Sequence, residues 1–450
     1  MVAIAATVPA YAQEIDVAVE ESAVEEVIVT AQRRSQRIQD VPMTVSAVSG
    51  AALEEYNIFT MTDVQTLTPG LVLDASDGRQ ARAALRGVTY DPDAGAAAGT
   101  VGFYFNEMAI DPAYAFRSLY DVGQVEVLRG PQGTLRGQPS PAGAVTIKSR
   151  GPDYNDYGGS ISQSLSDASL INTQAVINIP IIQDKLAVRL AGVYDSTDGN
   201  QVRSFNSGEE SSDLTRSFRA TVGWRPTDNL SIELVHQDTD SHTIVVPQVS
   251  GDGEPALGLG LGNGPVIGDF DRVGVTEGPN VYDYQIKLTT LIASYDFSEH
   301  RLSYTGGYQD TVQYSDQDTD SRNAFTSSFS VGGGAGFAQR QRIDSKYRQT
   351  THELRFANTG THFWNYMVGA NYLKIDSPTV VAADQVFQAC ADPAADPAVC
   401  FGAPYGGAVL SGALAQTPTS DMESTAFFTN HTLNFTDQRS VQLGLRYQEL

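Results

Sequence analysis

The side chains of this chain that could do chemistry are few and scattered. Asp316, Asp318 and Asp320 have the spacing that opens a calcium-binding loop. Ser321 stands where such a loop needs glycine and no glutamate follows at the twelfth position, so we expect an ordinary solvated loop. The six histidines form no His-Glu-x-x-His motif, and neither a nucleophile elbow nor a phosphate-binding loop occurs. The sequence predicts neither an enzyme, nor a metal site, nor a bound cofactor.

Two features at opposite ends of the chain indicate export. Cys390 and Cys400 lie close together in a polar segment, without the spacing of a zinc site or of a Cys-x-x-Cys redox motif. A loop disulfide formed in an oxidising compartment is the favoured interpretation. Residues 1–12 are small and apolar, and Ala10-Tyr11-Ala12 has the form of a signal-peptidase site, although no basic segment precedes it. We expect residues 1–12 to be a partial signal peptide.

Composition and charge narrow the class of protein. The 450 residues carry a formal net charge of −24, which argues against nucleic-acid binding because that needs a basic face. Hydrophobic residues make up 41% and glycines number 41, a composition typical of a folded, turn-rich β protein. No run of 18 apolar residues occurs, so a membrane protein of this sequence must span with β-strands that close into a barrel.

A short β-prone segment stands alone near the N-terminus. Residues 26–31 read Glu-Val-Ile-Val-Thr-Ala inside a stretch, 13–40, that otherwise predicts a flexible N-terminus. An ordinary short strand would explain it. A strand with no evident partner in its own chain is also typical of a docking strand, which pairs with the sheet edge of another protein. We call residues 26–31 the docking strand.

Residues 41–150 predict a compact α+β domain. Strand candidates at Pro42–Val48, Leu85–Val88 and Gly102–Phe105 are separated by polar or glycine-rich connections and one short helix. The domain ends in a β run at Val125–Arg129, a turn built on Gly130 and Pro131, and a second β run that closes at Ile147.

From residue 151 to 450 the pattern becomes that of transmembrane strands. About eleven runs of roughly 10–14 residues alternate apolar with polar positions. Short turns alternate with long connections, notably 242–281, 318–346 and 377–420. A soluble β-sandwich would also alternate, but it would rarely place aromatic residues near so many strand ends. Arg189, Arg219 and Arg446 share the polar face, which must therefore be wet or covered by protein.

The fold class predicted is mostly β: an N-terminal α+β domain followed by antiparallel transmembrane β-barrel strands. Eleven strands are about half of the 22-stranded barrel that encloses a plugged lumen. An open arc would leave two unpaired edges, so we expect the chain to be truncated at its C-terminus. The signal peptide without a basic segment indicates that it is truncated at its N-terminus as well.

The chain resembles the TonB-dependent receptors of the bacterial outer membrane. The resemblance rests on Glu25–Arg33, Gln39–Leu53, Leu85–Val88 and Val125–Ile147, and it covers nearly everything after residue 24. It identifies residues 26–31 as a TonB box, 41–150 as a plug domain and 151–450 as the N-terminal half of the barrel. The chain departs from the usual sequence motif at Arg136, where an aromatic residue is common in the family, and at Asn106-Glu107-Met108, where an Asp-Gly turn is usual.

The resemblance implies a function and partners. Members of the family import a scarce nutrient, often a ferric siderophore and also cobalamin, haem or glycans, when periplasmic TonB grips the box and the plug rearranges. The expected location is the outer membrane of a Gram-negative bacterium, and the expected partners are TonB, membrane lipid and a small ligand such as an iron chelate. A passive or structural barrel, or a non-transporting relic of such a receptor, is the alternative.

The resemblance also suggests roles for single residues. TonB contacts would come from the backbone of Glu26, Val27, Ile28, Val29, Thr30 and Ala31. Candidates for ion pairs between plug and barrel wall, or equally for pairs inside the plug, are Arg86, Glu126 and Arg129. Candidate ligand contacts at the plug apices are Arg79, Gln80, Tyr90, Asp91, Tyr114 and Phe116, since arginine and aromatic side chains suit anionic or aromatic iron chelates.

Overall fold

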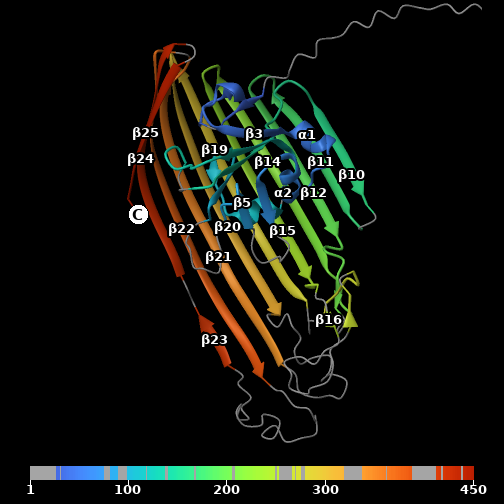
Figure 1. Cartoon of the computed structure of the whole chain (residues 1–450). Coiled ribbons are helices and arrows are strands. Elements are labelled where there is room, and N and C mark those ends of the chain that lie inside the picture. The colour runs from blue at the N-terminus through green and yellow to red at the C-terminus, as the bar shows by residue number, and fades with distance from the viewer. Residues whose placement is uncertain are drawn as a thin grey trace, which may run out of the picture.

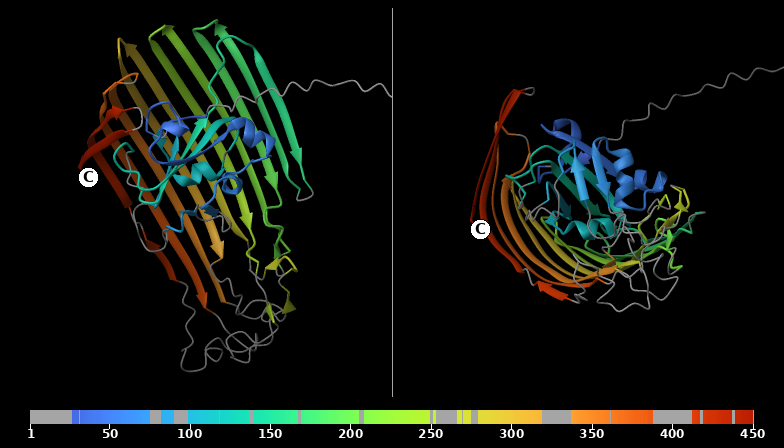
Figure 2. Two further views of the ribbon diagram at one scale, coloured as in Figure 1. Left: turned by 45° about the horizontal axis from the view of Figure 1, so that its top comes forward. Right: turned by 60° about the horizontal axis from the view of Figure 1, so that its bottom comes forward.

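The computed structural model shows a small α+β domain seated on the concave face of a large curved sheet (Figures 1 and 2). The described residues are 27–449 except 31, 75–81, 90–98, 118, 137–139, 167–168, 205–207, 249–250, 253–265, 269, 275–278, 319–336, 361, 388–411, 417–418 and 437–438. We call residues 41–150 the plug. The mostly β fold expected from the sequence is confirmed, with the plug inside an antiparallel arc.

Five strands form the sheet of the plug, in the order β3-β8-β9-β6-β7. They are β3 (Thr44–Ser49), β8 (Val122–Arg129), β9 (Gly143–Ser149), β6 (Val101–Phe105) and β7 (Met108–Ala109). All neighbours are antiparallel except β6 and β9, which are parallel. A separate pair joins β4 (Leu71–Asp74) to β5 (Arg82–Leu85). The motif around Gly130 and Pro131 thus connects two central strands, β8 and β9.

Short helices cover one face of the plug sheet. They are α1 (Gly50–Glu55), α2 (Met61–Val64) and α3 (Pro112–Arg117), with the 3-10 turn η2 (Gln65–Leu67). The other 3-10 turn, η1 (Ile38–Asp40), lies on the opposite face. Thr60 and Asp63 form a capping box at the start of α2. No helix in the described part of the chain is both long and apolar enough to cross a membrane.

Alternating side chains give the plug sheet two apolar faces. Val125, Val127 and Phe103 point into the main core with the helices, while Leu128 and Tyr104 point to the opposite face. The second face needs a cover, and residues 27–43 supply it.

Among the described residues, the barrel sheet has twelve strands, of which eleven follow one another in order, close to the number that the alternating pattern predicted. Each of the eleven pairs antiparallel with the next along the chain. In order they are β10 (Gly158–Leu165), β11 (Ile171–Ile182), β12 (Leu186–Thr197), β14 (Ser212–Thr227), β15 (Leu230–Val245), β19 (Asn280–Phe297), β20 (His300–Asp318), β21 (Phe337–Asn358), β22 (Trp364–Phe387), β24 (Thr419–Thr436) and β25 (Arg439–Glu449). β23 (Gly412–Gln416) adds to β22 beside this path.

The strands are longer than expected in the second half of the sheet. β21 has 22 residues and β22 has 24, so they take up parts of the segments 318–346 and 377–420 that the sequence predicted as connections. Two small pairs lie within the long connections: β13 (Arg203–Ser204) with β18 (Val273–Gly274), and β16 (Gly251–Asp252) with β17 (Val266–Ile267).

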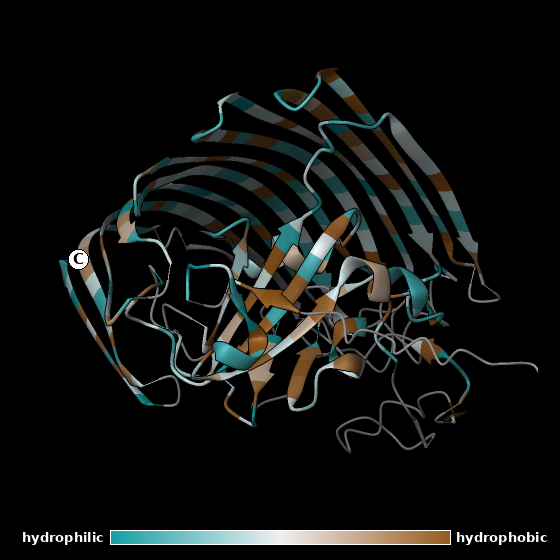
Figure 3. Ribbon diagram, turned by 90° about the horizontal axis from the view of Figure 1, so that it is seen from above, coloured by the Kyte–Doolittle hydropathy of each residue, from teal (hydrophilic) through white to brown (hydrophobic). Residues whose placement is uncertain are grey.

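The barrel sheet is polar toward the plug and apolar on its outer face. On β14, Arg219 and Thr221 are buried toward the plug, whereas Phe218 is 49% and Trp224 46% exposed. Figure 3 shows the resulting hydrophilic and hydrophobic bands along the strands. This arrangement inverts that of a soluble sheet and is typical of strands that face lipid outside and protein or water inside.

Candidate functional site

The docking strand folds back on its own chain. Ile28–Val29 (β1) pairs antiparallel with Gln36–Arg37 (β2). Arg33 takes a left-handed φ of 61° and its N–H donates to the Thr30 carbonyl at 2.9 Å, which closes the turn between them. The expectation that this strand lacks a partner in its own chain is therefore wrong for Ile28 and Val29, and the flexibility of residues 13–40 stays a prediction.

Burial holds the docking strand in place. Val29 is fully buried in a cluster with Tyr104, Leu128 and Ala144 on the second face of the plug sheet. Val27 and Ile28 are about half exposed. Glu26 and Ala31 lie outside the described residues, so their predicted contacts stay predictions.

Glu126 faces the docking strand instead of the barrel wall. Its Oε1 accepts from the Thr30 N–H at 2.8 Å and from the Thr30 hydroxyl at 3.0 Å. Arg129 donates to the Pro69 carbonyl at 2.9 Å, and Arg86 is exposed with no barrel contact among the described residues. In the described part of the chain, neither of the two predicted kinds of ion pair is observed for these three residues: Glu126 bonds the docking strand and Arg129 a plug carbonyl. The reason for Glu126 and Arg129 is that β8 is an inner strand of the plug sheet, with helices on one face and residues 27–43 on the other.

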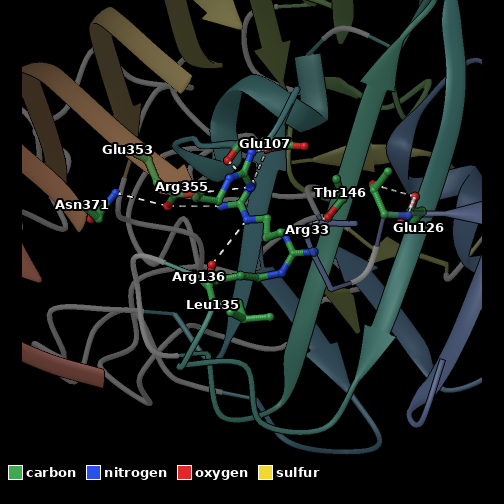
Figure 4. Close-up of polar contacts among 10 residues, drawn as sticks. Arg33, Glu107, Glu126, Leu135, Arg136, Thr146, Glu353, Arg355 and Asn371 are labelled. Carbon is green, nitrogen blue, oxygen red and sulfur yellow. Dashed lines mark hydrogen bonds and ion pairs between the residues drawn. The ribbon is translucent and has the colours of Figure 1, made fainter. Parts of the chain in front are cut away.

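The contact between plug and barrel centres on Glu107 (Figure 4). Glu107 lies in the turn between β6 and β7, where Asn106 (φ 45°) and Glu107 (φ 70°) both adopt the positive φ that such a tight hairpin requires. Its carboxylate is 3.4 Å from Nη1 of Arg33 and accepts a hydrogen bond from Arg355 of β21. Glu353 of β21 lies 3.9 Å from Arg33 and 3.4 Å from Arg355.

We call Arg33, Glu107, Glu353 and Arg355 the seam cluster. The side chains of Arg33, Glu353 and Arg355 are between 3% and 6% exposed, so their charges rely on one another. Burial by itself would raise the pKa of Glu107, but the guanidinium groups of Arg355 and Arg33 overcome this and lower the pKa to about 2. Asn106 and Glu107, which stand where an Asp-Gly turn is usual, thus keep the hairpin. Glu107 also adds a carboxylate that pairs with Arg33 and Arg355.

Arg136, the other departure from the family wording, lies beside this cluster. It is 2% exposed, its guanidinium lies over the Tyr104 ring at 4.6 Å, and Nη1 donates to the Thr146 hydroxyl at 3.0 Å. Burial and the neighbouring Arg33 lower the pKa of Arg136 to about 10. Arg136 thus takes the position at which an aromatic residue is common, and its guanidinium stacks on the ring of Tyr104.

The residues on either side of Arg33 also reach the barrel. Gln32 Nε2 donates to Gln442 Oε1 of β25 at 3.0 Å. Arg34 donates to Asn358 Oδ1 at 3.5 Å and to the carbonyl of Tyr366 on β22. Residues 32–34 therefore tie the end of the docking strand to three barrel strands and to the plug.

Comparison with known proteins agrees with this architecture. Residues 37–144 match the family described as TonB-dependent Receptor Plug Domain. The chain is 26% identical over 210 residues to the vitamin B12 transporter BtuB of Vibrio vulnificus, covering 43% of this chain and 32% of that protein. It is 27% identical over 223 residues to the pesticin receptor of Yersinia pestis, covering 47% of this chain and 30% of that protein.

Solved structures share the fold. The ferric yersiniabactin uptake receptor FyuA of Yersinia pestis superposes with a TM-score of 0.72 at 16% identity, over 90% of this chain and 56% of that one. The ferripyoverdine receptor of Pseudomonas aeruginosa gives 0.68 at 12% identity, over 95% and 55%. The chain spans about a third of the curated relatives it matches. The solved structures show the fold, and the plug match shows the family to which residues 37–144 belong.

Residues 37–144 belong to the plug-domain family of the TonB-dependent receptors, and we call the chain the receptor from here on. The receptor is accordingly a protein of the Gram-negative outer membrane, with its plug inside the barrel sheet.

A second contact joins the receptor's plug to strands β12–β15. Asp121 accepts two hydrogen bonds from Arg189, at 2.9 and 2.7 Å. Arg219 is 1% exposed, lies over the Tyr120 ring at 4.4 Å and donates to the Tyr120 and Asp121 carbonyls. Protein therefore covers Arg189 and Arg219, one of the two states predicted for the polar face.

Two of the predicted ligand residues belong to the interior. Tyr114 is 1% exposed and its hydroxyl donates to Gln237 Oε1 of β15 at 2.6 Å. Phe116 packs against Phe103, with ring centroids 5.8 Å apart. Both lie on α3, which is wedged between the plug core and the barrel sheet. The buried Tyr114 contradicts the prediction that it contacts ligand, whereas Phe116 is partly exposed and its ligand contact stays a prediction. Arg79, Gln80, Tyr90 and Asp91, like Cys390 and Cys400, lie outside the described residues.

The residues that join plug to barrel were not found from the sequence. Glu107 was noticed only as a departure from a turn motif, and Asp121 was not singled out. The arginines on the polar face of the barrel strands were the sequence signal that could have found these contacts. A buried cation needs a hydrogen-bond acceptor, here from the domain that it faces.

Proposed function

We propose that the receptor imports a scarce nutrient across the outer membrane and that TonB supplies the energy by pulling on the docking strand. The continuity of the chain carries this proposal. The docking strand is followed at once by Gln32, Arg33 and Arg34, which bind the barrel wall and the seam cluster. Force applied to Val27–Thr30 would therefore reach the contacts that keep the plug seated.

The proposed cargo is a ferric siderophore or a similar iron complex. Two of the similar structures are receptors for ferric yersiniabactin and ferripyoverdine, which supports an iron chelate; the similarity to a vitamin B12 transporter makes cobalamin the second candidate. Arg79, Gln80, Tyr90, Asp91 and Phe116 stay the proposed ligand contacts, and Cys390 with Cys400 the proposed loop disulfide.

Proline at position 28 tests the role of the docking strand. The backbone N–H and C=O of Ile28 point away from β2. Ile28→Pro therefore removes an N–H that a pairing strand from TonB would use. In cells producing the receptor, we expect Ile28→Pro to abolish energised uptake of radiolabelled iron carried by yersiniabactin or pyoverdine, or of labelled vitamin B12, while binding of the transported compound to the cells persists.

Ile28→Ala is the matched control, because it shortens the same side chain and keeps the backbone donor. Uptake by Ile28→Ala should be close to that of the wild type. Normal energised uptake by Ile28→Pro would refute the role given to the docking strand.

A further inference from the structure

The outward edge of β1 carries the backbone groups that an added strand would use. In an antiparallel pair, alternate residues direct their N–H and C=O toward the partner strand and the residues between direct theirs away. The Ile38 N–H donates to the Val27 carbonyl at 2.9 Å, which turns Val27 and Val29 toward β2. Ile28 therefore presents its backbone groups on the opposite edge. Thr30 presents its N–H there, while its carbonyl accepts from the Arg33 N–H in the turn.

Two side chains of β8 already occupy that edge. Gln124 Nε2 donates to the Ile28 carbonyl at 3.0 Å, and Glu126 Oε1 accepts from the Thr30 N–H at 2.8 Å. Because Gln124 and Glu126 are two positions apart on one strand, they point to one face with the same repeat of about 6.8 Å that separates Ile28 from Thr30. One donor and one acceptor stand where a neighbouring strand would place its own N–H and C=O.

We propose that Gln124 and Glu126 form an edge cap, two side chains that imitate a neighbouring strand and must be displaced before a periplasmic partner can pair with the docking strand. The inference rests on the proposed function, in which that partner is TonB. While β1 is seated, its pairing edge faces β8 and is satisfied. Capture by the partner therefore follows release of the edge and does not extend the seated β1–β2 hairpin.

Glu126 is the stronger half of the cap. It is 2% exposed and receives both the N–H and the hydroxyl of Thr30 on the same oxygen. Its second oxygen has no hydrogen-bond partner among the described residues, and burial raises the pKa of this carboxyl. If Thr30 left alone, Glu126 would remain buried without its donors, which is costly. The strand is therefore expected to be either seated or fully released, with few states between.

The edge cap sets the fraction of receptor molecules in which the docking strand is released and can pair with the partner. A ligand that binds only a minor state loses apparent affinity by the fraction of molecules in that state. Removing the cap should raise the released fraction and the affinity for the partner by the same factor. This shared factor separates an edge cap from a side chain that merely supports the fold.

The test uses the complete receptor in lipid vesicles and two measurements. A nitroxide label on Ile28→Cys reports the mobile fraction of the docking strand without any partner. The affinity for the isolated periplasmic domain of TonB is measured on unlabelled receptor. The variants are Glu126→Ala, Gln124→Ala and the conservative Glu126→Gln, which keeps an acceptor. Glu54→Ala is the matched control, because Glu54 is an exposed plug carboxylate paired with Arg150 at 2.9 Å.

We expect Glu126→Ala to raise both the mobile fraction and the affinity by about tenfold, as the loss of a charged hydrogen bond predicts, with Gln124→Ala smaller and Glu126→Gln intermediate. Gln124 is only half-buried, so its variant keeps the result interpretable if Glu126→Ala does not fold. Mobility and affinity equal to those of Glu54→Ala in both alanine variants would overturn the edge cap.

The two proposals fail in different ways. Increased mobility without TonB binding in any protein, wild type included, would support the cap and remove the proposed function. Equal TonB binding by all proteins with unchanged mobility would support the function and overturn the cap.

Discussion

Replacing Glu107 by glutamine removes the negative charge that holds the seam cluster together. Glutamine has nearly the same shape, so Glu107→Gln keeps the hairpin between β6 and β7. Arg33 and Arg355, whose side chains are 3% and 6% exposed, lose the carboxylate between them. Only Glu353 would remain close to both cations.

Two independent estimates of the cost agree. A pKa lowered from 4.5 to about 2 corresponds to about 3 kcal/mol of stability at neutral pH. Removing one partner of a buried ion pair typically costs about 3–5 kcal/mol. The side chain of Glu107 keeps 25% exposure, which favours the lower figure. We therefore expect Glu107→Gln to destabilise the seated plug by about 3 kcal/mol, or on the order of 10 °C in its melting temperature.

The pH dependence supplies a sharper test. The pKa of Glu107 is lower in the folded receptor, so its stabilisation is fully present above its unfolded value near 4.5 and is lost as the pH falls toward 2. Glutamine does not titrate. Calorimetric melting of the detergent-solubilised receptor should show a wide gap between wild type and Glu107→Gln at pH 7, which closes progressively between about pH 4.5 and 2.

Glu54→Gln is the control for this experiment. Its side chain is 67% exposed and its ion pair with Arg150 lies at the surface, so less than about 1 kcal/mol is expected. A Glu107→Gln melting temperature equal to that of Glu54→Gln, or a gap that stays constant down to pH 2, would refute the reasoning.

Two further variants test other parts of the receptor. Tyr114→Phe should cost about 1 kcal/mol, because it removes the hydroxyl that donates to Gln237, and it should leave ligand binding unchanged in an equilibrium binding assay; weakened ligand binding with unchanged stability would restore Tyr114 as a ligand contact. Gly143→Ala should prevent the plug from seating, as measured by protease resistance, because its φ is 150° and a Cβ would lie 2.2 Å from the Leu128 carbonyl oxygen. Gly133→Ala, where a Cβ meets nothing within 4 Å, should be tolerated, and equal protease resistance of the two would contradict this account.

Much of the fold could be predicted because its signals are periodic and local. Alternation along each strand predicted about eleven barrel strands, and eleven pair in order. Strand length was less predictable: β21 and β22 continue past the ends of their amphipathic runs, because pairing with a neighbour stabilises residues whose own pattern is weak.

The candidate site was harder to predict. The docking strand was found by its composition, yet its seat was not, since the turn at Arg33 depends on a left-handed residue that arginine rarely supplies. Tyr114 was predicted to contact ligand, and Glu126 to form an ion pair with the barrel wall or inside the plug. Both are buried, because the strands and helix that carry them are covered on both sides.

The resemblance to a family, the plug, the alternation of the barrel strands and the position of the docking strand can all be found in the sequence, because each depends on residues that are neighbours in the chain. Which charges meet depends instead on the folded protein. Arg355 and Glu107 are 248 positions apart, and Glu126 and Thr30 are 96 apart. A buried charge needs an opposite charge or a hydrogen-bond partner, but the sequence does not say which one. That choice is made when the curved sheet packs against the plug and excludes water from the surface between them.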